Sequence, residues 1–301
     1  MTIRELDQLI EEGKSLKQIA QAYSEIANQK IKRIRGQLEV NRIFFKDMSK
    51  VYALVKALAK NKKISVSKPK KMLCIILTSN YRFYGQINSD LIDFFIQITK
   101  GIDTDRIVLG KAAIEYFKNT NIFKNYRGAF GTREILLKSD QPDALELTGL
   151  VNIIREYNQV LIFYSRLKSL LVQEPAYTDI TSTTEKISLD KQSLRSDDLK
   201  KESTHFTAKQ EVPHFIFEPE LIRILAFFDS QILTLLLEES FLESEVSRTA
   251  SRFISMDQAE NEANKVLKDY ERLRSYAQRN LQSNQLLESI ASILAVRKEV
   301  Q

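Results

Sequence analysis

The feature that most constrains this chain is its last stretch, which contains neither glycine nor proline. Gly149 is the final glycine and Pro219 the final proline, so nothing between Glu220 and Gln301 interrupts a helix. At about 1.5 Å per residue, such a helix would be on the order of 120 Å long, well beyond the usual length of a globular helix. We therefore expect a helix that extends out of the body of the protein.

Apolar stripes run along both ends of the chain. In the last segment, residues such as Ala263, Leu267 and Tyr270 recur at spacings of three and four. The predicted seam of the first segment runs through Leu6, Leu9, Gly13, Leu16, Ala20, Tyr23, Ala27, Ile31, Ile34 and Leu38. Its one slip, between Tyr23 and Ile31, predicts a stutter. Each stripe needs a partner, and the simplest solution is that they pair as an antiparallel two-helix coiled coil.

The middle of the chain has the pattern of a small α/β domain. Met72–Leu77 is a continuous apolar run typical of a strand buried on both faces, and Arg106–Leu109 and Val160–Phe163 indicate two more strands. Helical patterns lie at residues 90–99, 111–118 and 143–156. Strands that alternate with helices predict a Rossmann-like domain with a largely parallel sheet.

The expected fold class is therefore α/β with a long α-helical coiled coil, in three parts. These are an N-terminal coiled-coil helix at 1–68, an α/β foot domain at 69–218 and a C-terminal coiled-coil helix at 219–301. Within the foot, the polar segment 178–211 is expected to be an exposed loop, and His214–Phe217 a returning strand. Pro219 is expected in the first turn of the last helix.

Composition and motifs argue against an enzyme. Cys74 is the only cysteine, which excludes an internal disulfide and a multi-cysteine zinc site and fits a reducing compartment. Gly13-Lys14-Ser15 resembles the end of a phosphate-binding loop but lacks its first glycine and its preceding strand. The loop at 78–88 has one glycine and bulky aromatics that obstruct a phosphate. We expect no catalytic residue, metal or cofactor, and a nucleotide-binding enzyme is the last alternative.

Positive charge is concentrated in the first quarter of the chain. Residues 1–71 carry 17 Lys or Arg against 7 Asp or Glu, whereas the net charge of the whole chain is +6. The basic residues of the first helix could follow a nucleic-acid backbone, steer an acidic protein partner or simply solvate the outer face of a coiled coil. They are Lys30, Lys32, Arg33, Arg35 and Arg42. A basic coiled-coil adaptor that binds nucleic acid through residues 30–71 is the alternative function.

Four blocks of sequence carry a family resemblance. Residues 18–30 follow the pattern K-I-T-K-A-M-x-M-V-A-x-x-K, and residues 80–88 lie over D-R-G-L-C-G-G-L-N. Phe217-Glu218-Pro219 matches F/Y-E-P, and residues 243–256 overlay E-S-x-A-S-E-x-x-A-R-M-x-A-M. In this order, these patterns resemble the gamma chain of F-type ATP synthases over nearly the whole chain. The departures are Tyr81–Tyr84 in place of glycines, and a second-helix signature that lacks its Thr and Glu.

The resemblance implies a non-catalytic rotor shaft of a bacterial ATP synthase. The coiled coil would enter a hexamer of three alpha and three beta chains, and the foot would contact the epsilon chain and the membrane c-ring. Ring rotation would turn the foot, and the asymmetric shaft would bias each catalytic subunit differently for ATP synthesis or hydrolysis. The chain would be a peripheral protein on the cytoplasmic side of the bacterial cell membrane, with no nucleic-acid partner.

The resemblance also implies three groups of contact residues. Contacts to the catalytic subunits would come from Lys30, Lys32, Arg33, Arg279, Asn280 and Asn284. An apolar bearing would consist of Ile290, Ile293, Leu294 and Val296. The foot would use Tyr81, Arg82, Phe83, Tyr84, Phe217 and Glu218. By residue type alone, the bearing is equally the end of a coiled-coil seam, and the foot aromatics are equally core residues.

Overall fold

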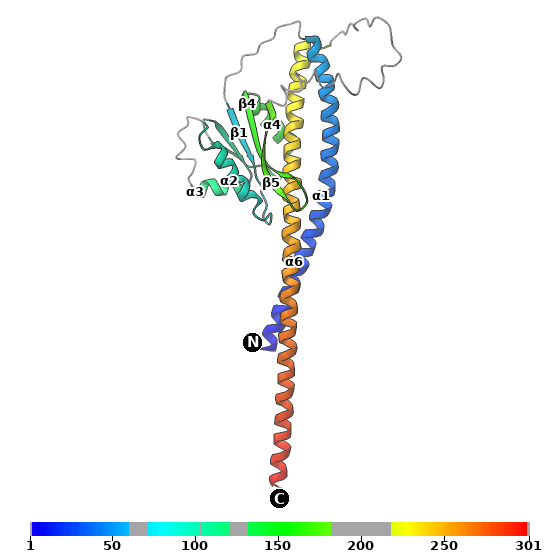
Figure 1. The fold of residues 1–301 in the computed structure, drawn as a ribbon, viewed down its shortest axis with the longest axis vertical. Helices are drawn as coiled ribbons and strands as arrows, with labels where there is room; N and C mark the ends of the chain where they lie inside the picture. The colour runs from blue at the N-terminus through cyan, green and yellow to red at the C-terminus, as the bar shows by residue number, and fades with distance from the viewer. Residues whose placement is uncertain (1, 60–71, 103, 121–131, 182–217, 300–301) are drawn as a thin grey trace, which may run out of the picture. The chain divides into compact units, whose positions relative to one another are not determined.

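Figure 1 shows a computed structural model that describes residues 2–59, 72–102, 104–120, 132–181 and 218–299. The chain divides into two compact units. Residues 30–251 form the sheet unit, and residues 1–29 together with 252–301 form the tip unit. Helices α1 (Ile3–Ala59) and α6 (Leu221–Glu299) contribute to both units. The predicted fold class, two long helices with an α/β domain between them in sequence, is confirmed.

The foot is built on a five-stranded sheet with the strand order β3-β2-β1-β4-β5. Its strands are β1 (Met72–Leu77), β2 (Asp105–Leu109), β3 (Thr132–Ile135), β4 (Gln159–Leu167) and β5 (Gln173–Asp179). The first four strands are parallel, and β5 runs antiparallel to β4. Sequence analysis missed β3, which is short and polar, and β5, which contains Pro175 as an edge strand can.

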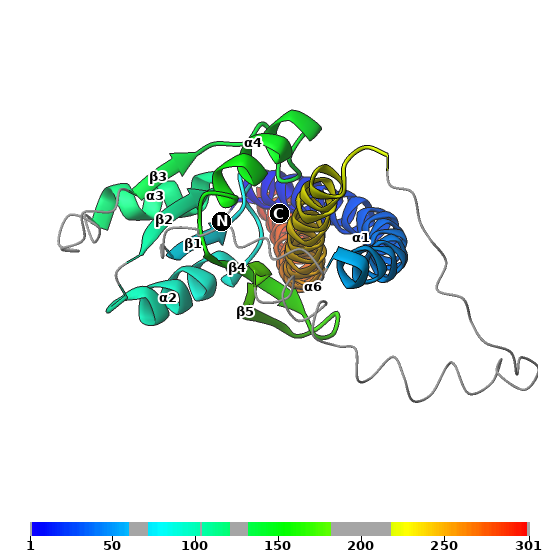
Figure 2. The same ribbon diagram turned by 90° about the horizontal axis from the view of Figure 1, so that it is seen from above.

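Helices cover both faces of this sheet, which explains the continuous apolar run of β1. Cys74 and Ile76 face one core, to which α2 (Ile87–Thr99) and α3 (Lys111–Thr120) contribute. Leu73, Ile75 and Leu77 face the other core, which includes residues of α4 (Ala144–Ile154), α1 and α6. Seen from above, α2 and α6 lie on opposite sides of the strands (Figure 2).

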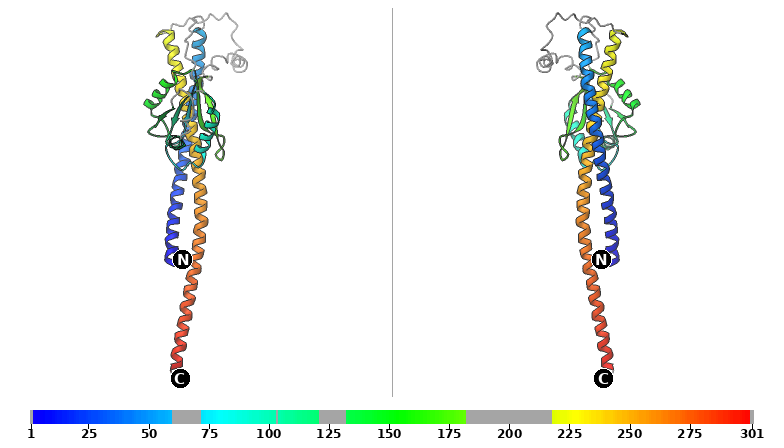
Figure 3. Two further views of the ribbon diagram at one scale, coloured as in Figure 1. Left: turned by 90° about the vertical axis from the view of Figure 1, so that its left-hand side faces the viewer. Right: turned by 90° about the vertical axis from the view of Figure 1, so that its right-hand side faces the viewer.

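In the sheet unit, α1 and α6 run antiparallel and side by side (Figure 3). Ile34 of α1 forms a small core with Leu242 and Val246 of α6. Further along, the hydroxyl of Tyr52 donates a hydrogen bond to the carboxylate of Asp229 at 2.5 Å. Burial and this hydrogen bond raise the pKa of Tyr52. The apolar contacts hold the helices together, and the polar contact fixes how far one is displaced along the other.

The same two helices pair antiparallel in the tip unit. Asp7 near the start of α1 forms an ion pair with Arg274 of α6. About four helical turns further along α1, Gln21 donates a hydrogen bond to Glu260 at 2.6 Å. Residue numbers therefore rise along α1 as they fall along α6, as an antiparallel pair requires.

The α1 seam alternates between spacings of four and three without interruption, so the predicted stutter is wrong. The buried or half-buried positions in the tip unit include Leu6, Ile10, Gly13, Lys17, Ala20, Ser24 and Ala27. Sequence analysis instead placed Leu16 and Tyr23 in the seam, but these side chains are 64% and 38% exposed. The helices come close at Gly13, where a Cβ atom would lie 2.9 Å from the side chain of Leu267.

Several boundaries differ from those predicted. The backbone N–H of Ile224 donates to the carbonyl of Glu220, and α6 begins at Leu221, so Pro219 lies before the first turn. Residues 178 and 179, predicted as loop, end strand β5. The remainder of the polar segment from residue 182, and the predicted strand at 214–217, lie outside the described residues.

Candidate functional site

The basic cluster of Lys30, Lys32 and Arg33 on α1 divides into one paired and two exposed side chains. The Nζ atom of Lys30 lies 2.5 Å from a carboxylate oxygen of Glu245 on α6, and Glu245 is only 2% exposed. Lys32 and Arg33 are exposed, and neither forms an ion pair within the described part of the chain. Lys30 therefore neutralises a buried carboxylate of its own chain, whereas Lys32 and Arg33 present charge to the outside.

Glu245 belongs to a buried polar run on α6. Ser244, Ser247 and Arg248 are each at most 1% exposed. The two serine hydroxyls and the Nε atom of Arg248 have no hydrogen-bond partner among the described residues. Buried polar groups without partners cost free energy, so the stability of this region must come from the apolar side chains around them and from the Lys30–Glu245 pair.

A second apolar stripe on α1 is a candidate contact surface that sequence analysis did not separate from the seam. Leu16, Ile19, Tyr23 and Ile26 recur at spacings of three, four and three, and their side chains are 38% to 64% exposed. The sequence does contain a signal for this second stripe, because two apolar heptad patterns with different phases occur on the same helix. One pattern packs on α6 within the tip unit, and the side chains of the other are exposed, as is typical of an interaction surface.

The polar residues predicted near the end of α6 occupy two separate faces. Asn280 and Asn284 line a depression of about 650 Å³ together with Thr2 and Ile3 at the start of α1. Arg279 lines a different depression, of about 420 Å³, formed by α6 alone. The structure thus brings the two asparagines together and leaves Arg279 apart from them.

The last part of α6 forms an exposed apolar tip. Residues 281–293 are all exposed, and Ile290 and Ile293 are 53% and 66% exposed. In Figure 1, this end of α6 continues past the start of α1. Leu294 and Val296 belong to the same helix, but their side chains lie outside the described ones. Apolar residues exposed in this way are typical of an interaction surface.

The aromatic residues after β1 do not form a single surface. Tyr81 and Phe83 are 53% and 59% exposed, whereas Tyr84 is 2% exposed. The hydroxyl of Tyr84 donates to the carboxylate of Asp140 at 2.8 Å, and the same carboxylate accepts the backbone N–H of Asn80 at 2.7 Å. Tyr84 is therefore a core residue that anchors the loop, and Tyr81 and Phe83 are the side chains that the loop displays.

The backbone of this loop explains the difference. Phe83 has φ of 69°, a left-handed conformation that bulky residues rarely adopt, and Gly85 has φ of 60°. Consecutive residues thereby point in different directions. Of the other predicted foot residues, Arg82 and Glu218 are exposed, and Phe217 lies outside the described residues.

The carboxyl end of the sheet, where an α/β domain would bind a nucleotide, is closed by the chain itself. The first N–H groups of α3, at Lys111, Ala112 and Ala113, donate to Asn80, Ser79 and Thr78 respectively. Such donors hold phosphate in nucleotide-binding domains, and here they are already used. A Cβ atom at Gly110, whose φ is 97°, would lie 2.3 Å from a backbone oxygen of Thr78.

Other chemical features of the described residues are sparse. They contain no cluster of three His, Cys, Asp or Glu side chains suited to a metal ion. None of the described helices has a stretch both long and apolar enough to cross a lipid bilayer. Burial raises the pKa of the Cys74 thiol, which disfavours the thiolate that metal binding or nucleophilic chemistry would need.

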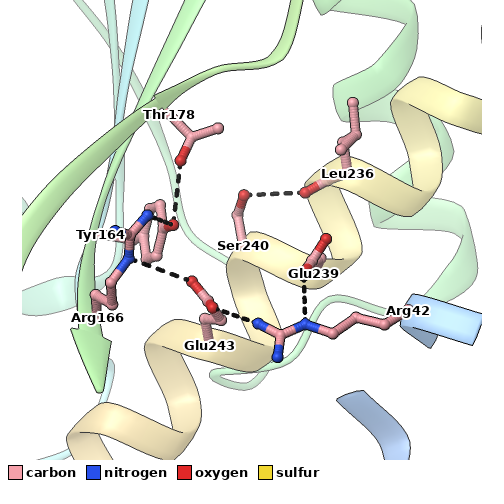
Figure 4. A network of polar contacts seen from close by, with 8 residues as sticks. All are labelled: Arg42, Tyr164, Arg166, Thr178, Leu236, Glu239, Ser240 and Glu243. Atoms are coloured by element: carbon pink, nitrogen blue, oxygen red, sulfur yellow. Dashed lines mark hydrogen bonds and ion pairs between the residues drawn. The ribbon is translucent and has the colours of Figure 1, made fainter. Parts of the chain in front are cut away.

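A polar network links the foot to both long helices within the sheet unit (Figure 4). Glu243 of α6 accepts a hydrogen bond from Arg42 of α1 at 2.7 Å, and its other oxygen lies 4.0 Å from Nε of Arg166 on β4. Arg42 also donates to Glu239 at 2.8 Å, and Arg166 donates to the hydroxyl of Tyr164 at 3.3 Å. Burial raises the pKa of this hydroxyl, so it stays protonated.

Comparisons with known proteins agree over most of the chain. A family model described as ATP synthase matches residues 2–295. An ATP synthase gamma chain from Staphylococcus saprophyticus is 21% identical over 294 residues, covering 92% of this chain and 94% of the relative. One from Mycoplasma mycoides is 26% identical over 193 residues, covering 64% and 61%. A solved chain titled Tetrahymena thermophila mitochondrial ATP synthase, central stalk and c-ring, has a TM-score of 0.53 at 17% identity, covering 80% of this chain and 99% of that one.

Proposed function

The chain belongs to the ATP synthase gamma-chain family, and from this premise we propose how its parts work as the rotor subunit of the central stalk. The observation that carries the proposal is the antiparallel pairing of α1 and α6 in both units, with the foot formed by the chain between them. A shaft transmits motion and needs no active site. In this proposal the chain is non-catalytic, and ATP is made or hydrolysed on partner chains.

The tip unit enters the central cavity of a hexamer of three alpha and three beta chains. Two helices side by side lack threefold symmetry, so each catalytic subunit meets a different face of the shaft and is biased toward a different conformation. One face carries the exposed stripe of Leu16, Ile19, Tyr23 and Ile26. Rotation of the shaft therefore changes the three catalytic subunits in turn.

The basic residues of α1 provide the charged part of this contact. Lys32 and Arg33 are exposed, so they are free to attract an acidic surface of a catalytic subunit. Lys30 acts indirectly, because its ammonium group is engaged by Glu245 and holds α1 in place. Asn280 and Asn284 add neutral amide hydrogen bonds near the end of α6, which are weaker than charge-assisted ones.

The exposed end of α6 serves as a bearing. Ile290 and Ile293 contact an apolar wall of the cavity, and the proposed bearing also includes Leu294 and Val296 of the same helix. Apolar attraction has no preferred direction, so its energy changes little as the shaft turns. A bearing made of charged side chains would instead create angular barriers at each ion pair.

The foot carries the contacts to the epsilon chain and the membrane c-ring. Tyr81 and Phe83 are exposed aromatics on one loop, and Arg82 and Glu218 add charge. Exposed aromatic side chains often anchor protein interfaces. The chain is then held peripherally on the cytoplasmic side of a bacterial cell membrane, through the complex.

Native purification of the tagged full-length chain from its own cell membranes tests this proposal. We expect it to carry a stoichiometric ATP-hydrolysing hexamer, the epsilon chain and the ring, identified by mass analysis and an ATPase assay. Variants Lys32→Gln and Arg33→Gln should weaken coupling between ATP hydrolysis and ion pumping in that complex. Recovery of the chain without ATPase partners, or with bound nucleic acid, would overturn the rotor assignment.

A further inference from the structure

The foot rests on the long helices of the sheet unit mainly through apolar contacts. The larger core joins residues of β1 and β4 to Ile232, Leu236 and Phe241 of α6. Apolar attraction stabilises such an interface but sets no direction, so it resists separation better than it resists a small rotation. Directional contacts between α6 and the foot therefore decide how firmly the angle between them is held.

Two such contacts lie at the carboxyl ends of neighbouring parallel strands. Ser251 of α6 donates a hydrogen bond to the backbone carbonyl of Tyr84, after β1, at 2.7 Å. Glu243 of α6 faces Arg166, near the end of β4, at 4.0 Å. The two positions on α6 are separated by about 12 Å along the helix axis. Contacts at two separated points oppose rotation more effectively than either contact alone.

Glu243 also reaches the other long helix. One of its oxygens accepts a hydrogen bond from Arg42 of α1 at 2.7 Å, while the other faces Arg166. Arg42 is itself held by Glu239, one turn earlier on α6, at 2.8 Å. The side chain of Glu243 is 18% exposed, so water screens these charges less than at an open surface. One carboxylate thus connects α1, α6 and β4.

The network continues into the edge of the sheet. Arg166 donates to the hydroxyl of Tyr164, and that hydroxyl shares a hydrogen bond of 3.1 Å with Thr178 on β5. Figure 4 shows these groups converging from the two strands on the α6 face that carries Glu243. A displacement of β4 or β5 relative to α6 must lengthen at least one of these contacts.

We propose that Glu243 is a positioning residue that fixes the angle between the foot and the two-helix shaft. When the foot rotates, the shaft then turns through the same angle. This inference rests on the proposed rotor function. Removing the charge leaves the apolar core intact, so the complex still assembles and hydrolyses ATP. What changes is the torsional stiffness between the foot and the shaft.

The test measures angular fluctuations in the purified complex, with the hexamer fixed to a surface, a rod attached to the ring and rotation halted by removal of ATP. Variants Glu243→Gln and Arg166→Gln remove the two sides of the contact. We expect each to raise the variance of the rod angle about two-fold. The effect is modest because a partly exposed ion pair contributes little energy. The double variant should exceed Glu243→Gln alone by little, because Glu243→Gln already removes the contact with Arg166.

The matched control is Glu134→Gln, which removes the carboxylate of the Lys118–Glu134 ion pair inside the foot. It should leave the variance at the wild-type value. Unchanged variance in Glu243→Gln and Arg166→Gln, with the complex intact, would overturn the inference alone. If Glu243→Gln does not assemble, Arg166→Gln decides, since that side chain is 54% exposed and outside the core. Failure of the wild-type chain to assemble would instead overturn the rotor function.

Discussion

Replacing Lys30 by methionine should destabilise the chain far more than replacing an exposed lysine of the same helix. Methionine keeps the length and the helix propensity of lysine, so the change removes mainly the charge. The lost contact is the 2.5 Å ion pair with Glu245, which is 2% exposed and would remain as an unpaired buried carboxylate. Breaking a fully buried pair costs about 3–5 kcal/mol.

The expected cost here is smaller, because 27% of the Lys30 side chain is exposed and water reaches the pair from that side. We therefore expect a loss of about 1–3 kcal/mol in the free energy of unfolding. Urea unfolding of the full chain measures it, as a lower midpoint with an unchanged slope. The control is Lys32→Met, an exposed lysine on the same helix, which should change stability by less than about 0.5 kcal/mol.

A double variant separates the cost of leaving a buried carboxylate unpaired from the cost of losing the contact itself. Lys30→Met combined with Glu245→Gln leaves a neutral amide in place of the unpaired carboxylate and should recover part of the lost stability. Equal midpoints for Lys30→Met and Lys32→Met would refute the reasoning, because they would show that the folded chain does not depend on neutralising Glu245.

Four further outcomes are expected. Gly110→Ala should lower the unfolding free energy by about 2–4 kcal/mol, because φ of 97° and a Cβ contact of 2.3 Å to a backbone oxygen exclude a side chain. Gly36→Ala on α1, where a Cβ atom meets open space, should raise the unfolding free energy by up to about 1 kcal/mol. Burial and a hydrogen bond to a carboxylate raise the pKa of Tyr157 to about 12. Its contribution is complete below the unfolded value of about 10 and lost as pH rises toward 12, so Tyr157→Phe should flatten the alkaline fall in unfolding midpoint. Ile290→Asp with Ile293→Asp should leave the midpoint unchanged, since both are exposed, and lower ion pumping per ATP in the assembled complex.

The long elements could be predicted because their signals accumulate over many residues. The absence of glycine and proline after Pro219 predicted a helix that the structure places at Leu221–Glu299. The apolar run of β1 predicted a strand buried on both faces, and residues 73–77 are at most 1% exposed. β5 escaped prediction because its register is set by pairing with β4, and its own sequence alternates weakly.

The phase of the seam could not be predicted from apolar residues alone. Leu9 and Ile10 are both apolar neighbours, so the seam could pass through either of them. Leu16 is apolar as well and favours the phase that the structure does not use. The structure buries Ile10 and uses Lys17 and Ser24 as half-buried seam positions, so the polarity of those two residues concealed the pattern. Packing against α6 decided the phase within the tip unit, and that information is distributed over both ends of the chain.

The sequence did not distinguish paired from exposed side chains among the candidate contact residues. Lys30 and Lys32 are equivalent as basic residues of one helix, yet only Lys30 has a buried carboxylate opposite it, from a residue more than two hundred positions away. By residue type, Tyr84 is indistinguishable from its exposed neighbours, and only the hydrogen bond from its hydroxyl to Asp140 sets it apart. In both cases, the deciding partner is remote in sequence and has no local signature.

The antiparallel register of α1 and α6 also determines the order in which the chain can fold. The strands of the foot pair with one another within residues 72–179, whereas the contacts of Asp7 and Gln21 require Arg274 and Glu260 of α6. On a ribosome, the first helix is therefore complete long before its partner exists, and its apolar seam stays unpaired while the sheet forms. Contacts of such long sequence separation are slow to form. The nascent chain should depend on chaperone protection of α1 until the partner residues of α6 have been synthesised.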